Sequence, residues 1–174
     1  TASRLKNWIA CNYTTINEID KKGLKKKESS TTEKIRKRRG DEFEEKIYKK
    51  LIIQYPKHIE IKKDDNRFEK TKEALKKGYD LIHKAHFKYK GWVGEIDFLI
   101  KDQNKKTKKG KWRYEVYDTK LSSIAKTDHI TQISLYSEWI ATQQDNELPD
   151  FMYLILGIKD KEKKVNILKI DEEI

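Results

Sequence analysis

Two short apolar segments, each with an acidic residue, most constrain what this chain can fold into. The first reads GWVGEIDFLIK and carries Asp97, and the second reads YEVYDTKLSS and carries Asp118. The residues around both acids are mainly β-branched and aromatic, which are the types that favour interior strands. Charges in such strands are costly to desolvate unless they are paired or bound to a metal. We therefore expect two core strands that bring these carboxylates into one site.

The spacing of these acids predicts a shared face. Lys120 follows Asp118 by two residues, so in a strand both point to the same face, about 6.7 Å apart along the chain. If the segments pair as a hairpin, Asp97 lies on this face with its Cβ roughly 5 Å from that of Asp118. Repulsion between the two carboxylates is then on the order of 3 kcal/mol at an effective dielectric near 20. A divalent cation would relieve it, because such cations take oxygen ligands.

An acid-x-Lys triplet is weak evidence by itself. On the order of five such triplets should arise by chance in a chain this rich in acids and lysines. The alternative is an exposed strand end with a solvated acid and lysine. The apolar residues on both sides of Asp118 favour the buried site.

Apolar periodicity and the positions of Gly and Pro predict alternating helices and strands. We expect helices over about residues 3–18, from 33 or 41 to 54, 67–77 and 127–143, and strands at 58–61, 79–89, 93–101, 111–121, 151–158 and 164–170. A three-strand meander, a helix and two further strands indicate an α+β fold with a sheet flanked by helices. The 174 residues suit one domain. We expect it to comprise a helical segment with a basic connection over 1–32 and a core over 33–174.

Several segments, in order, resemble the PD-(D/E)xK nucleases, in particular their RecB-like branch. These segments are residues 3–20, 40–51, 94–100, 114–123, 125–139 and 156–172. The most specific part is the D-T-K strand followed by a helix with the pattern Q-x-x-x-Y, here Gln132 and Tyr136. The resemblance implies a restriction-endonuclease-like core, with a central mixed β-sheet flanked by helices.

The resemblance also implies a role for each matched residue. Asp97 and Asp118 would hold Mg²⁺ or Mn²⁺, with the backbone carbonyl of Thr119 as a further oxygen ligand. Glu44 resembles the first-motif acid, which approaches the metal directly or through water. Lys120 would position or deprotonate the attacking water and stabilise charge that develops on the phosphate.

Alternatives remain for the supporting residues. Glu44 could be an ordinary solvated helix acid. Gln132 and Tyr136 share a helix face; the resemblance implies that both face the catalytic strands, whereas the alternative is a solvated amide and a core-edge aromatic. Many RecB-like nucleases carry an extra histidine ligand where this chain has Phe43, and no histidine here is an obvious replacement. We expect His129 at the surface or facing DNA rather than on the metal.

The charge of the chain indicates a polyanionic partner. Its 40 Lys and Arg against 29 Asp and Glu give a formal net charge of +11. Basic residues cluster at 21–27, 34–39 and 105–113. Such clusters favour salt-dependent binding of nucleic acid. The alternative is a set of merely solvated lysines, although it accounts poorly for the arginines among residues 34–39.

These observations predict a metal-dependent deoxyribonuclease that acts in DNA repair, recombination or processing on single- or double-stranded DNA. The resemblance adds a possible helicase or second nuclease domain as a partner. The alternatives are a non-catalytic nucleic-acid-binding module with a nuclease fold, and an RNA-directed or structure-specific endonuclease. The single cysteine, Cys11, suits a reducing cytoplasm. No apolar run approaches 18 residues, so we expect no membrane span.

Overall fold

The computed structural model describes residues 30–157 and the backbone of residues 165–171. The expected helix at 3–18 and the basic cluster at 21–27 lie outside the described residues. The elements are α3 (Thr31–Gln54), β1 (His58–Glu60), α4 (Arg67–Lys77), β2 (Leu81–Tyr89), β3 (Trp92–Lys106), β4 (Trp112–Lys120), α5 (Thr127–Gln143), β5 (Phe151–Gly157) and β6 (Val165–Asp171). The predicted order of helices and strands is confirmed over these residues.

The ends of the helices follow local capping chemistry. The side chain of Ser30 accepts a hydrogen bond from the backbone of Glu33, whose carboxylate accepts one from the Ser30 amide. This capping box starts α3 slightly earlier than expected. α4 ends at Gly78, which adopts the left-handed conformation with φ 66°. A Cβ at this glycine would lie 2.4 Å from the indole nitrogen of Trp112, so both conformation and space require glycine here.

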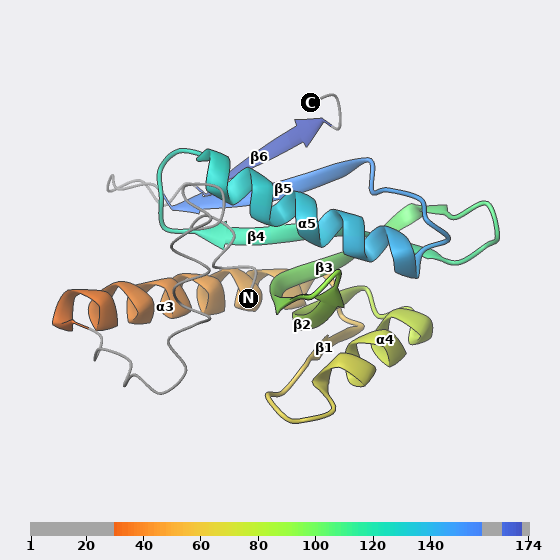
Figure 1. Ribbon diagram of the computed structural model, residues 1–174, viewed down its shortest axis with the longest axis horizontal. Helices are drawn as coiled ribbons and strands as arrows, with labels where there is room; N and C mark the ends of the chain where they lie inside the picture. Colours follow the sequence, from red (N-terminus) through yellow and green to blue (C-terminus); the bar gives the residue numbers. More distant parts are fainter. Residues whose placement is uncertain (1–29, 158–164, 172–174) are drawn as a thin grey trace.

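The strands form one mixed sheet in the order β1-β2-β3-β4-β5-β6 (Figure 1). β2, β3 and β4 make the predicted antiparallel meander, and β5 pairs antiparallel with β6. β1 with β2 and β4 with β5 are parallel pairs, which need a crossover connection. α4 and α5 provide these crossovers. β3 is longer than expected, because its hairpin with β4 continues past a register shift to the pair Lys106↔Trp112.

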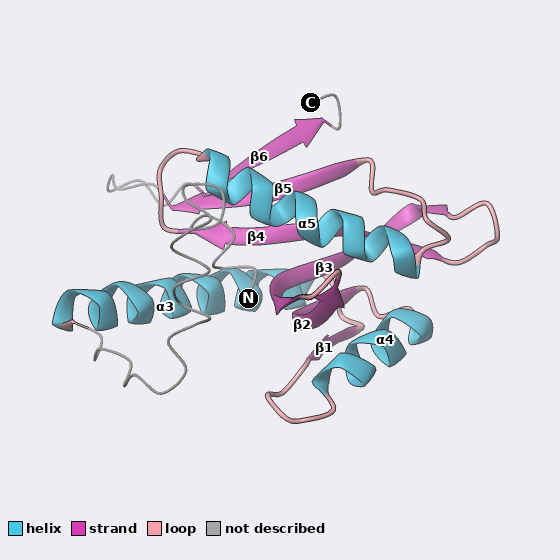
Figure 2. Ribbon diagram, viewed as in Figure 1, coloured by secondary structure: helices cyan, strands magenta, loops and turns pink. Residues whose placement is uncertain are grey.

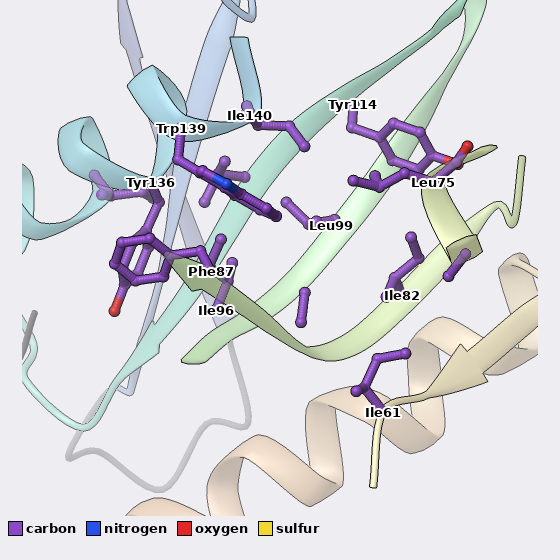
Figure 3. Close-up of a cluster of buried hydrophobic side chains, with 14 of the residues drawn as sticks. Ile61, Leu75, Ile82, Phe87, Ile96, Leu99, Tyr114, Tyr136, Trp139 and Ile140 are labelled. Atoms are coloured by element: carbon purple, nitrogen blue, oxygen red, sulfur yellow. The ribbon is translucent and has the colours of Figure 1, made fainter. Parts of the chain in front are cut away.

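Helices cover both faces of the sheet (Figure 2). α4 and α5 pack on one face over the larger core cluster, in which Tyr136, Trp139 and Ile140 of α5 meet Phe87 and other strand residues (Figure 3). α3 packs on the other face through a second cluster with Ile47 and its neighbours. The protein is therefore an α+β structure with a mixed sheet between helices. No helix in these described ranges is long and apolar enough to cross a membrane.

β2 changes face at Lys84, which explains why its sequence alternates imperfectly. Leu81 packs in the cluster beneath α3 and His83 stacks on α3 itself, whereas Ala85 and Phe87 belong to the cluster on the opposite face. In a regular strand all four would point the same way. Lys84 has φ 56°, an uncommon conformation for a residue with a side chain. Beyond Lys84 the alternation is therefore shifted, so that Ala85 and Phe87 point to the face opposite that of Leu81 and His83.

β3 makes the matching change at Asp97. Phe98 packs toward α3, but Ile96 packs in the opposite cluster. The pairs His83↔Phe98 and Ala85↔Ile96 flank this point, so the ladder keeps its register across the change. Asp97 therefore lies at a local irregularity of the sheet, and such places are enriched at functional sites.

We expect Gly78→Ala to lower the free energy of unfolding by about 2–4 kcal/mol, since it combines left-handed strain with overlap on Trp112. Gly40→Ala is the matched control, because Gly40 lies inside α3 and a Cβ there meets nothing within 4 Å. The control should stabilise the protein by about 0.5–1 kcal/mol. Denaturant unfolding of both variants measures the difference. Equal stability of Gly78→Ala and the wild type would contradict the packing described for α4.

Candidate metal and catalytic site

Asp97 and Asp118 meet where the ladder between β3 and β4 ends. The last pair at this end is Phe98↔Tyr117, and continuing this register by one residue puts Asp97 opposite Asp118. Asp97 Oδ2 accepts hydrogen bonds from the Thr119 amide at 2.7 Å and from Thr119 Oγ1 at 2.6 Å. The Asp97 carboxylate thus accepts the hydrogen bond from the Thr119 amide in place of a backbone carbonyl of β3. The two acids are brought together as the sequence predicted.

Lys120 lies on the same face as Asp118 and forms an ion pair with it. The Asp118 side chain is 2% exposed and that of Lys120 is 21% exposed. The pairs Asp118↔Leu154 and Lys120↔Leu156 place both residues within the sheet beside β5. Lys120 is therefore the more exposed member of this ion pair.

Glu44 comes to the site from α3, on the other side of the sheet from α5. Its Oε1 is 2.7 Å from His83 Nε2, and its side chain is 16% exposed. The charge of Glu44 raises the pKa of both Asp97 and Asp118. Glu44 is therefore a partly buried member of the acidic group, and the alternative of a freely solvated helix acid is wrong.

The acidic side chains of the site are buried, and burial disfavours their charged forms. Burial, then the charges of Asp118 and Glu44, raise the pKa of Asp97 well above its usual value. Burial also raises the pKa of Asp118, although Lys120 opposes this effect. Burial would lower the pKa of Lys120, but the charges of the two aspartates raise it. Lys120 thus lies beside the two aspartates, while the charge of Glu44 also acts on Lys84, whose pKa it raises.

This donor set fits a hard divalent cation, because carboxylate oxygens are the ligands that Mg²⁺ and Mn²⁺ take. Each carboxylate is already engaged: Asp97 by Thr119, Asp118 by Lys120 and Glu44 by His83. Among the described residues, no three His, Cys, Asp or Glu side chains form a ready-made metal cluster. A cation would have to draw these carboxylates from their present partners. The carbonyl of Thr119 stays a predicted ligand.

Gln132 and Tyr136 lie on the sheet-facing side of α5. Gln132 Nε2 donates to the Tyr136 hydroxyl at 2.5 Å. The Tyr136 ring is 1% exposed and packs edge-on against Phe87, while its hydroxyl points away from the other labelled side chains (Figure 3). Burial, then the charge of Asp118, raise the pKa of Tyr136, so its hydroxyl stays protonated. Tyr136 is thus a core aromatic whose polar end lies toward the acids.

Two histidines lie near the acidic group. The side chain of His129 is 12% exposed, and burial lowers its pKa; that it faces the surface or DNA rather than the metal stays a prediction. His83 is fully buried and contacts Glu44, a contact that was not predicted from the sequence. The break in alternation at Lys84 was the available signal, since it changes which face His83 and its neighbours occupy.

The two described basic clusters lie in different surroundings. Residues 34–39 form the exposed start of α3, which projects past the sheet on the side where α5 begins (Figure 1). Residues 105–113 form the tip of the β3–β4 hairpin, roughly 26 Å from Asp118 along β4. There Lys111 lies 2.5 Å from Asp145, and Arg113 lies 2.8 Å from Asp150. Three of the six basic residues of this cluster, Lys105, Lys111 and Arg113, are therefore paired with acids of the protein.

Comparisons with protein-family models, with curated proteins and with solved structures found no match to this chain. The chemistry of the site therefore rests on its own residues. Those residues are three carboxylates and a lysine, gathered by the consecutive strands β3 and β4 and by α3, which lies far before them in the sequence. Such an arrangement can hold a cation and a polyanionic substrate together.

We expect Asp97→Asn to stabilise the metal-free protein at neutral pH by up to about 3 kcal/mol, because it removes one charge of a repelling pair. The amide oxygen can still accept from Thr119. Asp118→Asn is the comparison: it leaves Lys120 without its buried partner and should not stabilise. Thermal unfolding of both variants in the presence of a chelator measures the effect.

The stabilisation by Asp97→Asn should depend on pH. The pKa of Asp97 is raised in the folded protein. The wild type therefore loses stability as pH rises from the pKa of the carboxyl in the unfolded chain, about 3.9, through its pKa in the folded protein. The variant has no such carboxyl. The difference should vanish below about pH 4 and grow toward neutrality. A constant difference across this range would contradict the assignment.

Proposed function

We propose that this chain is a metal-dependent nuclease that hydrolyses phosphodiester bonds in DNA, and that its sheet and helices form a restriction-endonuclease-like core of the PD-(D/E)xK type. The observation that carries the proposal is the convergence of Asp97, Asp118 and Glu44 with Lys120 in one partly buried site. Buried carboxylates in excess of nearby positive charge are the chemistry that a divalent cation neutralises.

Asp97, Asp118 and Glu44 would hold Mg²⁺ or Mn²⁺. When bound, the cation would lower the pKa of a water and polarise the phosphoryl oxygen. Asp118 would then no longer need Lys120 as its sole counter-charge, and the ammonium would turn to the attacking water and the phosphate. Gln132, hydrogen-bonded to Tyr136, would support Lys120 or contact the nucleic-acid backbone from α5.

The exposed start of α3 supports a polyanionic substrate. Lys37 precedes Glu44 by seven residues, which is two helical turns, so both lie on one face about 10.5 Å apart along the axis. Arg36 is also exposed and, among the described residues, forms no ion pair. A phosphate backbone that follows α3 would therefore run toward the acids. Such contacts hold DNA without reading its sequence.

We further propose a role in DNA repair, recombination or processing in the cytoplasm, together with a helicase or a second nuclease domain. One observation favours a different function, a non-catalytic nucleic-acid-binding module: every carboxylate of the site already has a partner within the protein. The two functions differ in whether a divalent cation changes the nucleic acid. A cleavage assay separates them.

The test is incubation of end-labelled single- and double-stranded DNA and RNA with Mg²⁺, Mn²⁺ or a chelator. We expect cleavage of DNA with either metal and none with the chelator. Asp97→Asn and Asp118→Asn should abolish it while the fold survives, because each keeps the shape but removes charge that the cation needs. Asp65→Asn, at an exposed loop position, is the control and should cleave like the wild type. Wild-type rates in either site variant would refute the metal assignment.

We expect Lys120→Ala to reduce turnover about 10²- to 10⁴-fold while metal and DNA still bind. The lysine acts mainly on charge that develops in the transition state, so affinity should change little. Metal binding should become slightly tighter, because one positive charge beside the cation is lost. Calorimetric titration with Mn²⁺ beside a cleavage assay on the same sample measures both. Loss of metal binding would instead make Lys120 a structural partner of the acids.

Replacing Arg36 and Lys37 together with glutamine should weaken DNA binding and lower its dependence on salt. Each lost phosphate contact reduces the slope of log K against log salt concentration by about 0.9 on double-stranded DNA. Lys105→Gln with Lys111→Gln is the charge-matched control, and its effect should be smaller because both lysines are already paired with acids. Equal losses from the two pairs would contradict the placement of DNA along α3.

A further inference from the structure

His83 is a buried histidine whose neighbours hold its ring in place and contact one of its two ring nitrogens. Its side chain is 0% exposed and lies in β2, where His83 pairs with Phe98 of β3. The imidazole stacks on Tyr48 of α3, with ring centroids 4.0 Å apart, and on Phe98, with centroids 5.0 Å apart. The ring is thus held between an aromatic of α3 and an aromatic of the sheet.

The polar atoms of this ring have one strong contact. Nε2 lies 2.7 Å from Glu44 Oε1. Nδ1 forms no hydrogen bond with any residue that the structure describes, and its approach to Glu60 Oε1 is 3.8 Å. Because an ionised carboxylate only accepts hydrogen bonds, we assign the hydrogen of this contact to Nε2, which donates the hydrogen bond to Glu44 Oε1. The contact joins residues 39 apart in the sequence and ties α3 to the sheet at the acidic site.

We propose that His83 is a positioning residue that holds the Glu44 carboxylate toward Asp97 and Asp118, ready to serve as the third carboxylate for a divalent cation. The inference rests on the proposed metal-dependent function and extends it to a residue that does not touch the cation. The clamped ring contacts one oxygen of the Glu44 carboxylate, so the second oxygen would be the one to take the cation. Hydrogen-bond partners of metal ligands act in this way in other metal sites.

The position of Glu44 on its helix supports this role. Glu44 extends from α3 on one side of the sheet, whereas Asp97 and Asp118 are held by strands. A free glutamate side chain has several rotatable bonds, and holding it in one conformation costs entropy on binding. His83 supplies that restraint before a cation arrives. Lys84, the next residue, has φ 56°, and beyond it Ala85 and Phe87 pack in the cluster on the opposite face.

The experiment measures Mn²⁺ affinity by calorimetry for the wild type and for His83→Phe. Phenylalanine keeps a flat ring between Tyr48 and Phe98 but cannot donate to Glu44. We expect the Kd for Mn²⁺ to rise about 10- to 100-fold, with little change in thermal stability in a chelator. An unchanged Kd in a folded His83→Phe protein would overturn the inference. His86→Phe is the matched control, because His86 is a buried histidine of the same strand that contacts Phe68 and not Glu44.

A double substitution separates positioning from direct ligation. If His83 acts through Glu44, His83→Phe should cause no further loss of Mn²⁺ affinity in a Glu44→Gln background. A further loss there would show that His83 acts on the metal by itself, and would overturn the proposal. A wild type that binds no Mn²⁺ would remove the proposed function as well, whereas normal wild-type binding with an unaffected His83→Phe removes only the role of His83.

Histidine ¹⁵N spectra of the wild-type protein provide a measurement that needs no variant. We expect the spectra to show that His83 carries its proton on Nε2. We also expect the Nε2 signal of His83 to shift when Mg²⁺ is added, but not when Na⁺ is added in place of Mg²⁺. A proton on Nδ1, or a signal that ignores Mg²⁺ while the protein binds it, would overturn the proposal even if His83→Phe fails to fold.

Discussion

The site depends on one constraint: two carboxylates, Asp97 and Asp118, lie close together on neighbouring strands. Asp97 and Asp118 lie where the β3–β4 ladder ends, and Asp97 takes over the hydrogen bond of the Thr119 amide. Burial raises the pKa of both carboxyls. The sheet therefore holds an arrangement that costs stability unless positive charge is supplied, and Lys120 supplies only one unit of it.

The surrounding structure is built to hold these charges in place. α5 closes one face with Tyr136 and Trp139 in the core, while α3 closes the other and contributes Glu44. Lys84 and Asp97 mark the point at which both strands change face. This change lets residues on one side of it pack against α3 and residues on the other side pack against α5. A regular pair of strands would not bring the same groups together.

Much of the fold followed from local signals in the sequence. Gly78 and Pro56 mark where two helices end, and the alternation of β3 and β4 gave their pairing and the approach of Asp97 to Asp118. The imperfect alternation of residues 79–89 signalled an irregular strand, but the sequence did not place the change of face at Lys84, since the left-handed conformation there belongs to a lysine rather than a glycine. The contact of His83 with Glu44 depends on that change and on the docking of α3, which are tertiary facts. The pairing of Lys111 and Arg113 of the hairpin with Asp145 and Asp150 also depends on tertiary structure and was not predictable from the sequence.

The most direct test of this account is the structure of crystals soaked in Mn²⁺, with anomalous scattering to locate the metal. The account predicts one strong peak bonded to carboxylate oxygens of Asp97 and Asp118, with Lys120 moved away from Asp118 and Glu44 still held by His83. A structure with no peak there, in which Asp97 keeps Thr119 and Asp118 keeps Lys120 at a saturating metal concentration, would contradict it.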